Sequence, residues 1–508
     1  MRLTAALCTG LLLAATGAAP AADRLRIGIG PEPETLDPHR GVSIGTARLL
    51  LDLCEGLLTR DGAGRTVPGV AVRIDRSADG LTLVFHLRAD ARWWNGDPVT
   101  AADFVRGWRR AVDPATASGI ADLLDGVEHA ADIRRGRLPP DRLGIQAADA
   151  RTLVVRLARP VADVDTILAH RITLPVHGPT LDAKGMDFAN ASNLMCNGPY
   201  RLIEHRLQQH YLLERADHWH GRAEVALAQV EMRVAERPEL ELNLFRSGDL
   251  HITSAVPAAM LDWARAERAE ALHVHPWTIL SALAANPDGP AWRGNAAFLE
   301  ALDLALDREQ LTATSQGRSI PAYGLVPTTL WPAAVNADPG PKGQARRDAA
   351  QGALRRAGFG PDRPPPRVEI VFAATDAIRQ RVVAIAAQWK QVLGVETDLI
   401  GMESRMISTR LAQRDFQGFI YNNWIGYSPS QMLAPFLPPA FTLTATDPAG
   451  QQAELRRAER AVLDSRHFIP LAQGSSLHMV APPVRGWQDN LYDIHPVRLL
   501  SLAPATPP

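Results

Sequence analysis

Two histidine pairs are the residues of this sequence whose spacing most directly suggests chemistry. His218 and His220 are two residues apart, and so are His273 and His275. Residues two apart on a strand share one face, so either pair has the spacing to hold a divalent metal ion. The first pair, however, falls in a stretch typical of a surface turn, and no third ligand is evident. We therefore expect no metal ion and no other cofactor, and interpret these histidines as structural or solvated.

The sequence motifs of common hydrolases are missing. Neither G-x-S-x-G nor H-E-x-x-H occurs, and no set of serine, histidine and aspartate has a recognisable spacing. Gly28 and Gly30 form a G-x-G, but Pro31 and Pro33 lie beside them and no helix begins there, which argues against a nucleotide-binding loop. We predict that the protein is not an enzyme. A metal-dependent enzyme built on a histidine pair is the alternative in that class.

Composition and charge limit the partners that the protein can have. The chain of 508 residues is 46% hydrophobic and 21% charged, with a formal net charge of −1. This balance favours neither nucleic acid nor an anionic membrane surface. The length exceeds that of one ordinary hydrophobic core and suggests two to four domains. We expect a globular protein that does not bind nucleic acid.

The N-terminus has the pattern of a secretory signal. Arg2 is the positively charged residue, residues 3–15 are apolar, and Ala19-Pro20-Ala21 has the small-x-small pattern of a cleavage site. The apolar run is shorter than the roughly 20 residues that span a bilayer. We expect residues 1–21 to be removed and the mature protein to be exported.

Two cysteines, Cys54 and Cys196, remain after removal of the signal with Cys8. A pair of cysteines in an oxidising compartment favours a disulfide. Two buried free thiols are the alternative, because cysteine is also a common core residue.

Residues 81–114 predict a strand, a tight turn and a helix. Apolar and other residues alternate with period two over 81–87, and Asn95-Gly96 is typical of a turn. Thr100 is predicted to cap a helix, with Asp103 in its first turn. A second helix is expected over 299–311 and a third over 378–393. Since strands and helices alternate along much of the chain, we expect an α/β architecture.

The segment 79–109 closely resembles a block of the peptide-binding family of ABC-transporter solute-binding proteins, extracellular family 5. The family pattern is DG-x4-F-x-L-R-x4-W-x-N-G-x-P-V-T-A-x-D-F-x3-W-x-R. The matching residues are Asp79, Gly80, Phe85, Leu87, Arg88, Trp93, Asn95, Gly96, Pro98, Val99, Thr100, Ala101, Asp103, Phe104 and Trp108, and Arg109 lies one position before the last Arg of the pattern.

The resemblance runs from about residue 25 to 495 and implies the two-lobe periplasmic-binding-protein fold, type II, of the large peptide-binding cluster. It implies a discontinuous first lobe and an extra β-rich subdomain. The implied segments are the signal peptide 1–21, lobe I 22–57 and 175–275, the extra subdomain 58–174, lobe II 276–474, and the return to lobe I with a disordered tail 475–508.

The resemblance also implies a function. The mature protein would be a monomeric periplasmic component of a peptide-type ABC importer, binding a peptide or peptide-like solute between its lobes. Its closed form would deliver the ligand to a permease in the inner membrane. The alternatives within the fold are a non-peptide ligand, such as a metal complex or a cell-wall fragment, and a sensor role.

The implied ligand-contacting stretch is 419–429, FIYNNWIGYSP. The family version is approximately G-W-x-x-D-Y-x-x-P, in which the Trp packs on the ligand and the Asp pairs with the peptide's α-ammonium group. Trp424 and Tyr427 match, and Gly426 precedes the Tyr, but the spacing is one residue short and the Asp is missing. Where oligopeptide-binding members carry basic residues for the peptide carboxylate, this chain has Tyr421 and Asn422, followed by Asn423.

The missing Asp has an energetic consequence. A buried ammonium without a carboxylate partner costs several kcal/mol. Either another acid replaces it, with Glu32 and Glu34 the nearest candidates, or the ligand has no free amine there. The resemblance further places Thr253 and Ser254 on a hinge strand with backbone contacts to an extended peptide, as in strand addition.

Overall fold

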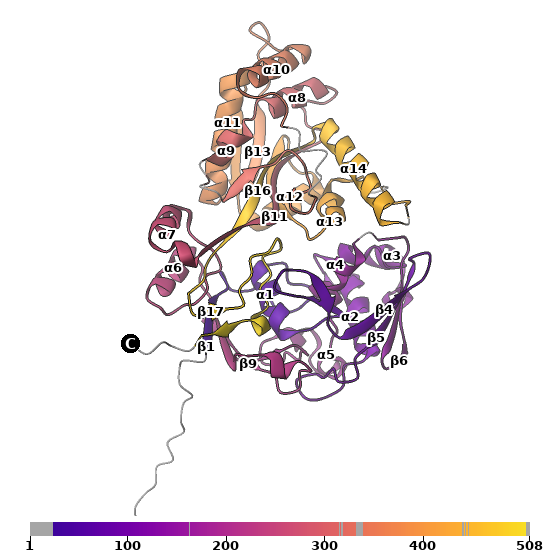
Figure 1. Cartoon of the computed structure of the whole chain (residues 1–508). Coiled ribbons are helices and arrows are strands. Elements are labelled where there is room, and N and C mark those ends of the chain that lie inside the picture. Colours follow the sequence, from indigo (N-terminus) through magenta and orange to yellow (C-terminus); the bar gives the residue numbers. More distant parts are fainter. Residues whose placement is uncertain are drawn as a thin grey trace, which may run out of the picture.

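The computed structural model describes residues 24–161, 163–313, 315, 318–331, 339–438, 441, 443–445 and 447–503. It contains two lobes, which lie one above the other in Figure 1. The predicted signal peptide and the last residues of the tail lie outside the described residues. Among the helices of the described ranges, none combines the length and the hydropathy needed to cross a membrane.

Lobe I contains a four-stranded sheet built from distant parts of the chain. Its order is β1-β10-β9-β8, with β1 parallel to β10 and the other pairs antiparallel. The bounds are β1 Arg24–Gly28, β8 Tyr200–Arg206, β9 His210–Arg215 and β10 Gln229–Arg233. Helix α1 (Ile44–Leu53) adds Leu49, Leu50 and Leu53 to the core of this sheet. The N-terminal strand is therefore completed by residues some 200 positions later.

A second sheet of lobe I forms the extra β-rich part. It has the order β4-β5-β7-β6, all antiparallel. The bounds are β4 Ala71–Arg76, β5 Thr82–Leu87, β6 Ile145–Asp149 and β7 Thr152–Arg156, with helix α2 (Ala101–Val112) against it. The strand, turn and helix predicted for 81–114 are confirmed. Gly96 has a φ of 90°, and Thr100 and Asp103 form a capping box.

The other elements of lobe I are short. They are β2 Leu58–Arg60, β3 Thr66–Pro68, α3 Ala130–Arg134, α4 Val164–Leu168, α5 Gly178–Lys184, α6 Pro238–Arg246 and α7 Leu261–Glu267.

Lobe II is built on a six-stranded sheet of order β12-β16-β11-β15-β13-β14. The strands are β11 Leu272–Ala285, β12 Ser319–Pro321, β13 Val368–Ala373, β14 Thr397–Met402, β15 Phe419–Ile425 and β16 Phe468–Met479. The helices are α8 Ala296–Leu304, α9 Arg308–Ala313, α10 Gly343–Arg356, α11 Asp376–Leu393, α12 Ser404–Gln413, α13 Pro429–Leu433 and α14 Pro448–Ser465. Helices α8, α10 and α11 share one core with the sheet, while α13 and α14 share another.

Two helix predictions in lobe II had different outcomes. The helix predicted over 378–393 is confirmed as α11, which ends at Gly394 with a φ of 71°. The single helix predicted over 299–311 is wrong, because the structure has α8 and α9 there. The Asp307 carboxylate accepts a hydrogen bond from the Gln310 N–H at 2.9 Å, so Asp307 starts a second helix.

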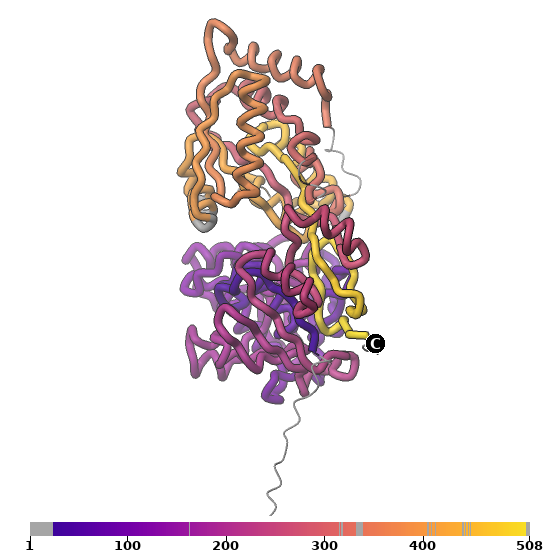
Figure 2. The backbone as a smooth tube through the Cα atoms, turned by 90° about the vertical axis from the view of Figure 1, so that its left-hand side faces the viewer, coloured from indigo at the N-terminus to yellow at the C-terminus, as the bar shows by residue number. Residues whose placement is uncertain are grey.

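Strands β11 and β16 connect the lobes. They pair from Leu272 with Met479 to Ala284 with Phe468, and their lower ends reach lobe I. Figure 2 shows the yellow C-terminal segment running down from lobe II along lobe I, where β17 (Val484–Arg485) pairs with β18 (Ser501–Leu502). The hinge strand expected at Thr253 and Ser254 is reduced to the neighbouring Ile252, which bridges Ile27 and Val480. The expected segment boundaries at 275 and 474 thus fall inside connecting strands.

The structure places the sulfur atoms of Cys54 and Cys196 within bonding distance, linking the end of α1 to the turn before β8. The disulfide stays a prediction, which a thiol titration of the denatured, unreduced mature protein can test. We expect no free thiol in that sample and two after reduction. Two thiols before reduction would contradict the bridge.

Candidate functional site

A cavity of about 160 Å³ lies between the lobes, at the lower ends of the connecting strands. Lobe I contributes most of its wall, from α1, β2 and the segment 169–174. Lobe II contributes Trp277, Ile425 and Tyr427, and the C-terminal segment contributes His478 and residues 492–495. Lobe I, lobe II and the C-terminal segment thus all contribute to the wall.

Tyr427 is a lobe II side chain that contacts residues of lobe I. Its ring centroid lies 6.1 Å from that of His170 and 5.7 Å from that of Tyr492. The Arg60 guanidinium carbon lies 5.6 Å from the same ring. Of the residues that sequence singled out in 419–429, Tyr427 is therefore the one that lines the interlobe cavity.

Trp424 packs in a hydrophobic core of lobe II. Its side chain is 9% exposed and packs against Phe436, with ring centroids 5.1 Å apart. It lines a separate open cavity of about 910 Å³ formed by lobe II and not the cavity between the lobes. The role that the family pattern implied for Trp424, packing on a ligand in the interlobe cleft, does not fit this geometry.

The other residues of that stretch that were predicted to contact the ligand do not line the interlobe cavity. The Tyr421 hydroxyl accepts a hydrogen bond from Arg381 at 3.1 Å, and Asn423 accepts one from the Ser281 hydroxyl at 2.7 Å. Asn422 pairs with Ala282 in the sheet. Gly426 has no space for a side chain, because an added Cβ would approach Met432 to 2.9 Å. These residues shape the end of β15 and do not face the cavity.

Glu32 and Glu34, the acids nearest to the missing Asp, both have structural partners. Glu32 accepts hydrogen bonds from His205 and from the Tyr211 hydroxyl on the β8–β9 hairpin. Glu34 accepts from Ser43 at the start of α1; although burial opposes ionisation, this and other hydrogen bonds lower the pKa of Glu34 to about 2. Neither carboxylate lines the cavity, so neither is placed to receive a ligand amine there.

Thr253 and Ser254 line the cavity, but their amide groups are already bonded. The Thr253 N–H donates to the Met479 carbonyl at 3.0 Å. The Ser254 N–H and hydroxyl both donate to the carboxylate of Glu241. Strand addition to a peptide would need other backbone groups of this segment.

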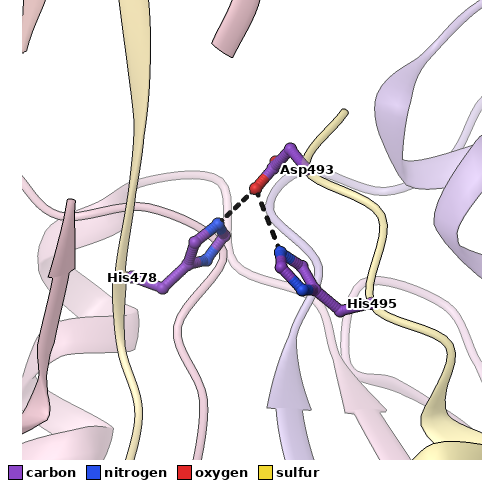
Figure 3. Close-up of side chains that lie close together, drawn as sticks. All are labelled: His478, Asp493 and His495. Carbon is purple, nitrogen blue, oxygen red and sulfur yellow. Dashed lines mark hydrogen bonds and ion pairs between the residues drawn. The ribbon is translucent and has the colours of Figure 1, made fainter. Parts of the chain in front are cut away.

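A buried acid at the hinge was not found by sequence reasoning. Figure 3 shows His478 and His495 both pointing at Asp493, which accepts from His478 Nε2 at 2.6 Å and from His495 Nε2 at 3.4 Å. Arg48 forms an ion pair with the same carboxylate at 2.8 Å. Burial opposes ionisation of Asp493, but His478 and Arg48 hold its pKa well below the usual range. The two-residue spacing of Asp493 and His495 is the sequence feature that could have indicated this cluster.

His478, Asp493 and His495 form the one metal-type cluster found in the described part of the chain. Two features oppose a cation there. Arg48 already neutralises the carboxylate, and His478 uses its second nitrogen, Nδ1, to donate to the Thr253 carbonyl at 2.8 Å. The cluster instead ties the C-terminal segment to α1 and to the hinge, and thereby shapes the cavity wall.

Asp52 supplies a pH-dependent group in the cavity wall. It is 2% exposed, and burial raises its pKa to about 7, although the Val497 N–H donates to it at 2.8 Å. Because the folded state holds this proton more tightly than the unfolded chain, the stability that Asp52 contributes falls as the pH rises from about 4 to about 7.

The variant Asp52→Asn tests this effect. We expect the difference in free energy of unfolding between the variant and the wild type to increase in favour of the variant by about 2 kcal/mol from pH 5 to pH 8. Urea denaturation at each pH measures it. His39 and His170, whose pKa values burial lowers to about 3, act in the opposite direction but are present in both proteins. A constant difference between the two proteins across this range would contradict the raised pKa.

Comparisons with known proteins agree with this architecture. The sequence profile of bacterial extracellular solute-binding proteins, family 5 middle, matches residues 65–441. The chain is 29% identical over 496 residues to the periplasmic oligopeptide-binding protein OppA of Escherichia coli strain K12, covering 91% of this chain and 90% of that protein. It is 30% identical over 376 residues to the probable deoxycholate-binding periplasmic protein YgiS of the same strain, covering 73% and 70%.

A solved structure resembles both lobes together. Haemophilus influenzae OppA in complex with the peptide RPPGFSPFR has a TM-score of 0.82 and 27% identity, covering 95% of this chain and 99% of that one. The two-lobe α/β fold expected from the sequence is thereby confirmed. Since the profile spans well over half of the sequence, this chain belongs to the bacterial extracellular solute-binding proteins of family 5.

Proposed function

We propose that the mature protein is the periplasmic substrate-binding component of a peptide-type ABC importer. It binds a peptide or peptide-like solute between its lobes as a monomer, without a cofactor, and its closed form docks on a permease in the inner membrane. Residues 1–21 direct export and are removed. Binding and release of the ligand, without covalent chemistry, complete its task.

The observation that carries this proposal is the cavity at the hinge between two lobes. Lobe I supplies most of the wall, while Tyr427 comes from lobe II, so that rotation of one lobe against the other opens or closes the site. The long strands β11 and β16 are continuous through the hinge and allow such a rotation without breaking either core. The likeness to OppA, named as an oligopeptide-binding protein, supports a peptide as the ligand class.

Native mass spectrometry of the mature protein, purified without refolding, tests the proposal. We expect an adduct of peptide mass that leaves on collisional activation, or a raised melting temperature with a library of random tri- to pentapeptides. A clean apo mass together with no thermal shift across the library would contradict peptide binding.

A non-peptide solute is the second candidate, and one observation favours it. No carboxylate occurs within 424–428, where the family pattern has an Asp that pairs with the peptide amine. The likeness to YgiS, named as a probable deoxycholate-binding protein, supports a ligand without an amine. Deoxycholate added to the same thermal-shift measurement separates the two candidates.

A further inference from the structure

We propose that the interlobe cavity selects its ligand by a carboxylate group, which Arg60 and Arg171 of lobe I bind. For a peptide this is the terminal carboxylate, and to that extent the inference rests on the proposed function. For a non-peptide solute it is any carboxylate carried on an apolar body. Arg60 and Arg171 lie outside the stretch 419–429 that the family pattern indicated.

Arg60 is a buried cation without a counter-ion among the described residues. It is 4% exposed, and its guanidinium carbon lies 4.5 Å from the ring centroid of Tyr492 and 5.6 Å from that of Tyr427. It donates a hydrogen bond to the Gly64 carbonyl at 2.8 Å, and no ion pair joins it to a carboxylate in the described ranges. The two rings offset part of its desolvation, but a full negative charge would offset more.

Arg171 is a partly buried cation that lines the same cavity and forms no ion pair with a carboxylate among the described residues. It donates to the Pro38 carbonyl at 3.1 Å, while its Nε is buried and has no hydrogen-bond partner among the described residues. The carboxylates that influence it are engaged elsewhere. Asp37 is bound by two nitrogens of Arg110, and Glu34 accepts from the start of α1. Burial lowers the pKa of Arg171, as it does that of Arg60.

The groups around the two arginines are hydrogen-bond donors. His170 Nδ1 accepts from the Ile172 N–H at 3.2 Å, so the ring carries its proton on Nε2. Burial, together with Arg171 and Arg60, lowers the pKa of His170 to about 3, so the ring is neutral. The indole N–H of Trp277, in the cavity wall, is buried and has no partner within the described part. Donors without acceptors indicate that the ligand supplies the acceptors.

The acids of the cavity wall do not cancel this positive charge. Asp493 is neutralised by Arg48 and held by His478. Asp52 has a pKa raised by burial to about 7 and is partly protonated at neutral pH. An ammonium group entering the cavity would therefore meet no free carboxylate among the described residues of its wall. A carboxylate would meet the guanidinium groups of Arg60 and Arg171, which are suited to carboxylate binding.

The test compares two libraries of random tri- to pentapeptides, one with free and one with amidated C-termini, and uses deoxycholate as a third probe. Dissociation constants are measured for the wild type, Arg60→Gln and Arg171→Gln. Arg65→Gln is the matched control, since Arg65 belongs to the same β2–β3 hairpin but its side chain is 79% exposed. Circular dichroism and melting curves establish that each variant is folded. If Arg60→Gln does not fold, Arg171→Gln decides.

We expect the wild type and Arg65→Gln to bind free-acid peptides about 10- to 100-fold more tightly than the amides, and each site variant to lose most of that preference. Equal binding of acids and amides by the wild type would overturn the carboxylate site and leave the peptide function intact. Binding of deoxycholate alone, weakened in both site variants, would support the carboxylate site and refute the peptide function. Binding of none of the three probes would overturn both.

Discussion

Replacing Asp303 by Asn is expected to lower the free energy of unfolding by about 3–5 kcal/mol, because it leaves a buried arginine without its counter-ion. Asp303 is 6% exposed and accepts hydrogen bonds from Arg308, at 2.5 Å, and from Arg466. Arg308 is itself 3% exposed, and its second contact, to the Pro470 carbonyl at 2.7 Å, brings no charge. Urea denaturation of the ligand-free protein measures the loss.

The control is Asp398→Asn, which removes the carboxylate of an exposed pair with Arg367. Both of these side chains are at least half exposed, so we expect a change below about 1 kcal/mol. A loss for Asp303→Asn no larger than that for Asp398→Asn would show that Arg308 finds another partner. The ion pair of Asp303 with Arg308 would then not be a major contribution to the stability of lobe II.

Local patterns in the sequence were enough to predict much of the fold. The strand, turn and helix of 81–114 follow from alternation, from Asn95-Gly96 and from the Thr100 cap, all of which act over a few residues. The helix α11 and its end at Gly394 are of the same kind. The prediction of one helix over 299–311 was wrong because Asp307 is compatible with two structural positions. It is a tolerable residue inside a helix, but it is a better N-cap for a new one.

The cavity wall depends on contacts between distant residues, and these carry no local signal. Asp493 meets Arg48 across more than 400 positions. Arg60 and Arg171 are ordinary arginines in sequence. Only the fold shows that they share a cavity and that neither pairs with a carboxylate of the described residues. Tyr427 was found because it belongs to a recognisable pattern. The same pattern suggested Trp424, whose side chain packs against Phe436 and does not line the interlobe cavity.

The buried position of Trp424 leads to the second large expected effect. Trp424→Ala is expected to lower the free energy of unfolding by about 3–5 kcal/mol, because it removes a large buried side chain from the core that contains Phe436, Met432 and Leu433. The family pattern alone would instead predict weaker ligand binding with an unchanged melting temperature. Thermal denaturation of the ligand-free variant distinguishes the two.

The matched control is Trp263→Ala, which removes a partly exposed tryptophan of α7 that lies under Arg246 and at the margin of a smaller apolar cluster. Since less surface is removed from the interior, we expect a loss of about 1–2 kcal/mol for Trp263→Ala. If the two variants melt alike and Trp424→Ala alone loses ligand, Trp424 must reach the ligand, and the cavity inside lobe II must open to it. The expected result is that Trp424→Ala is the less stable variant and, once folded, keeps the wild-type preference for free-acid peptides. In that case Trp424 supports β15, and the ligand contacts Tyr427 and the arginines of lobe I.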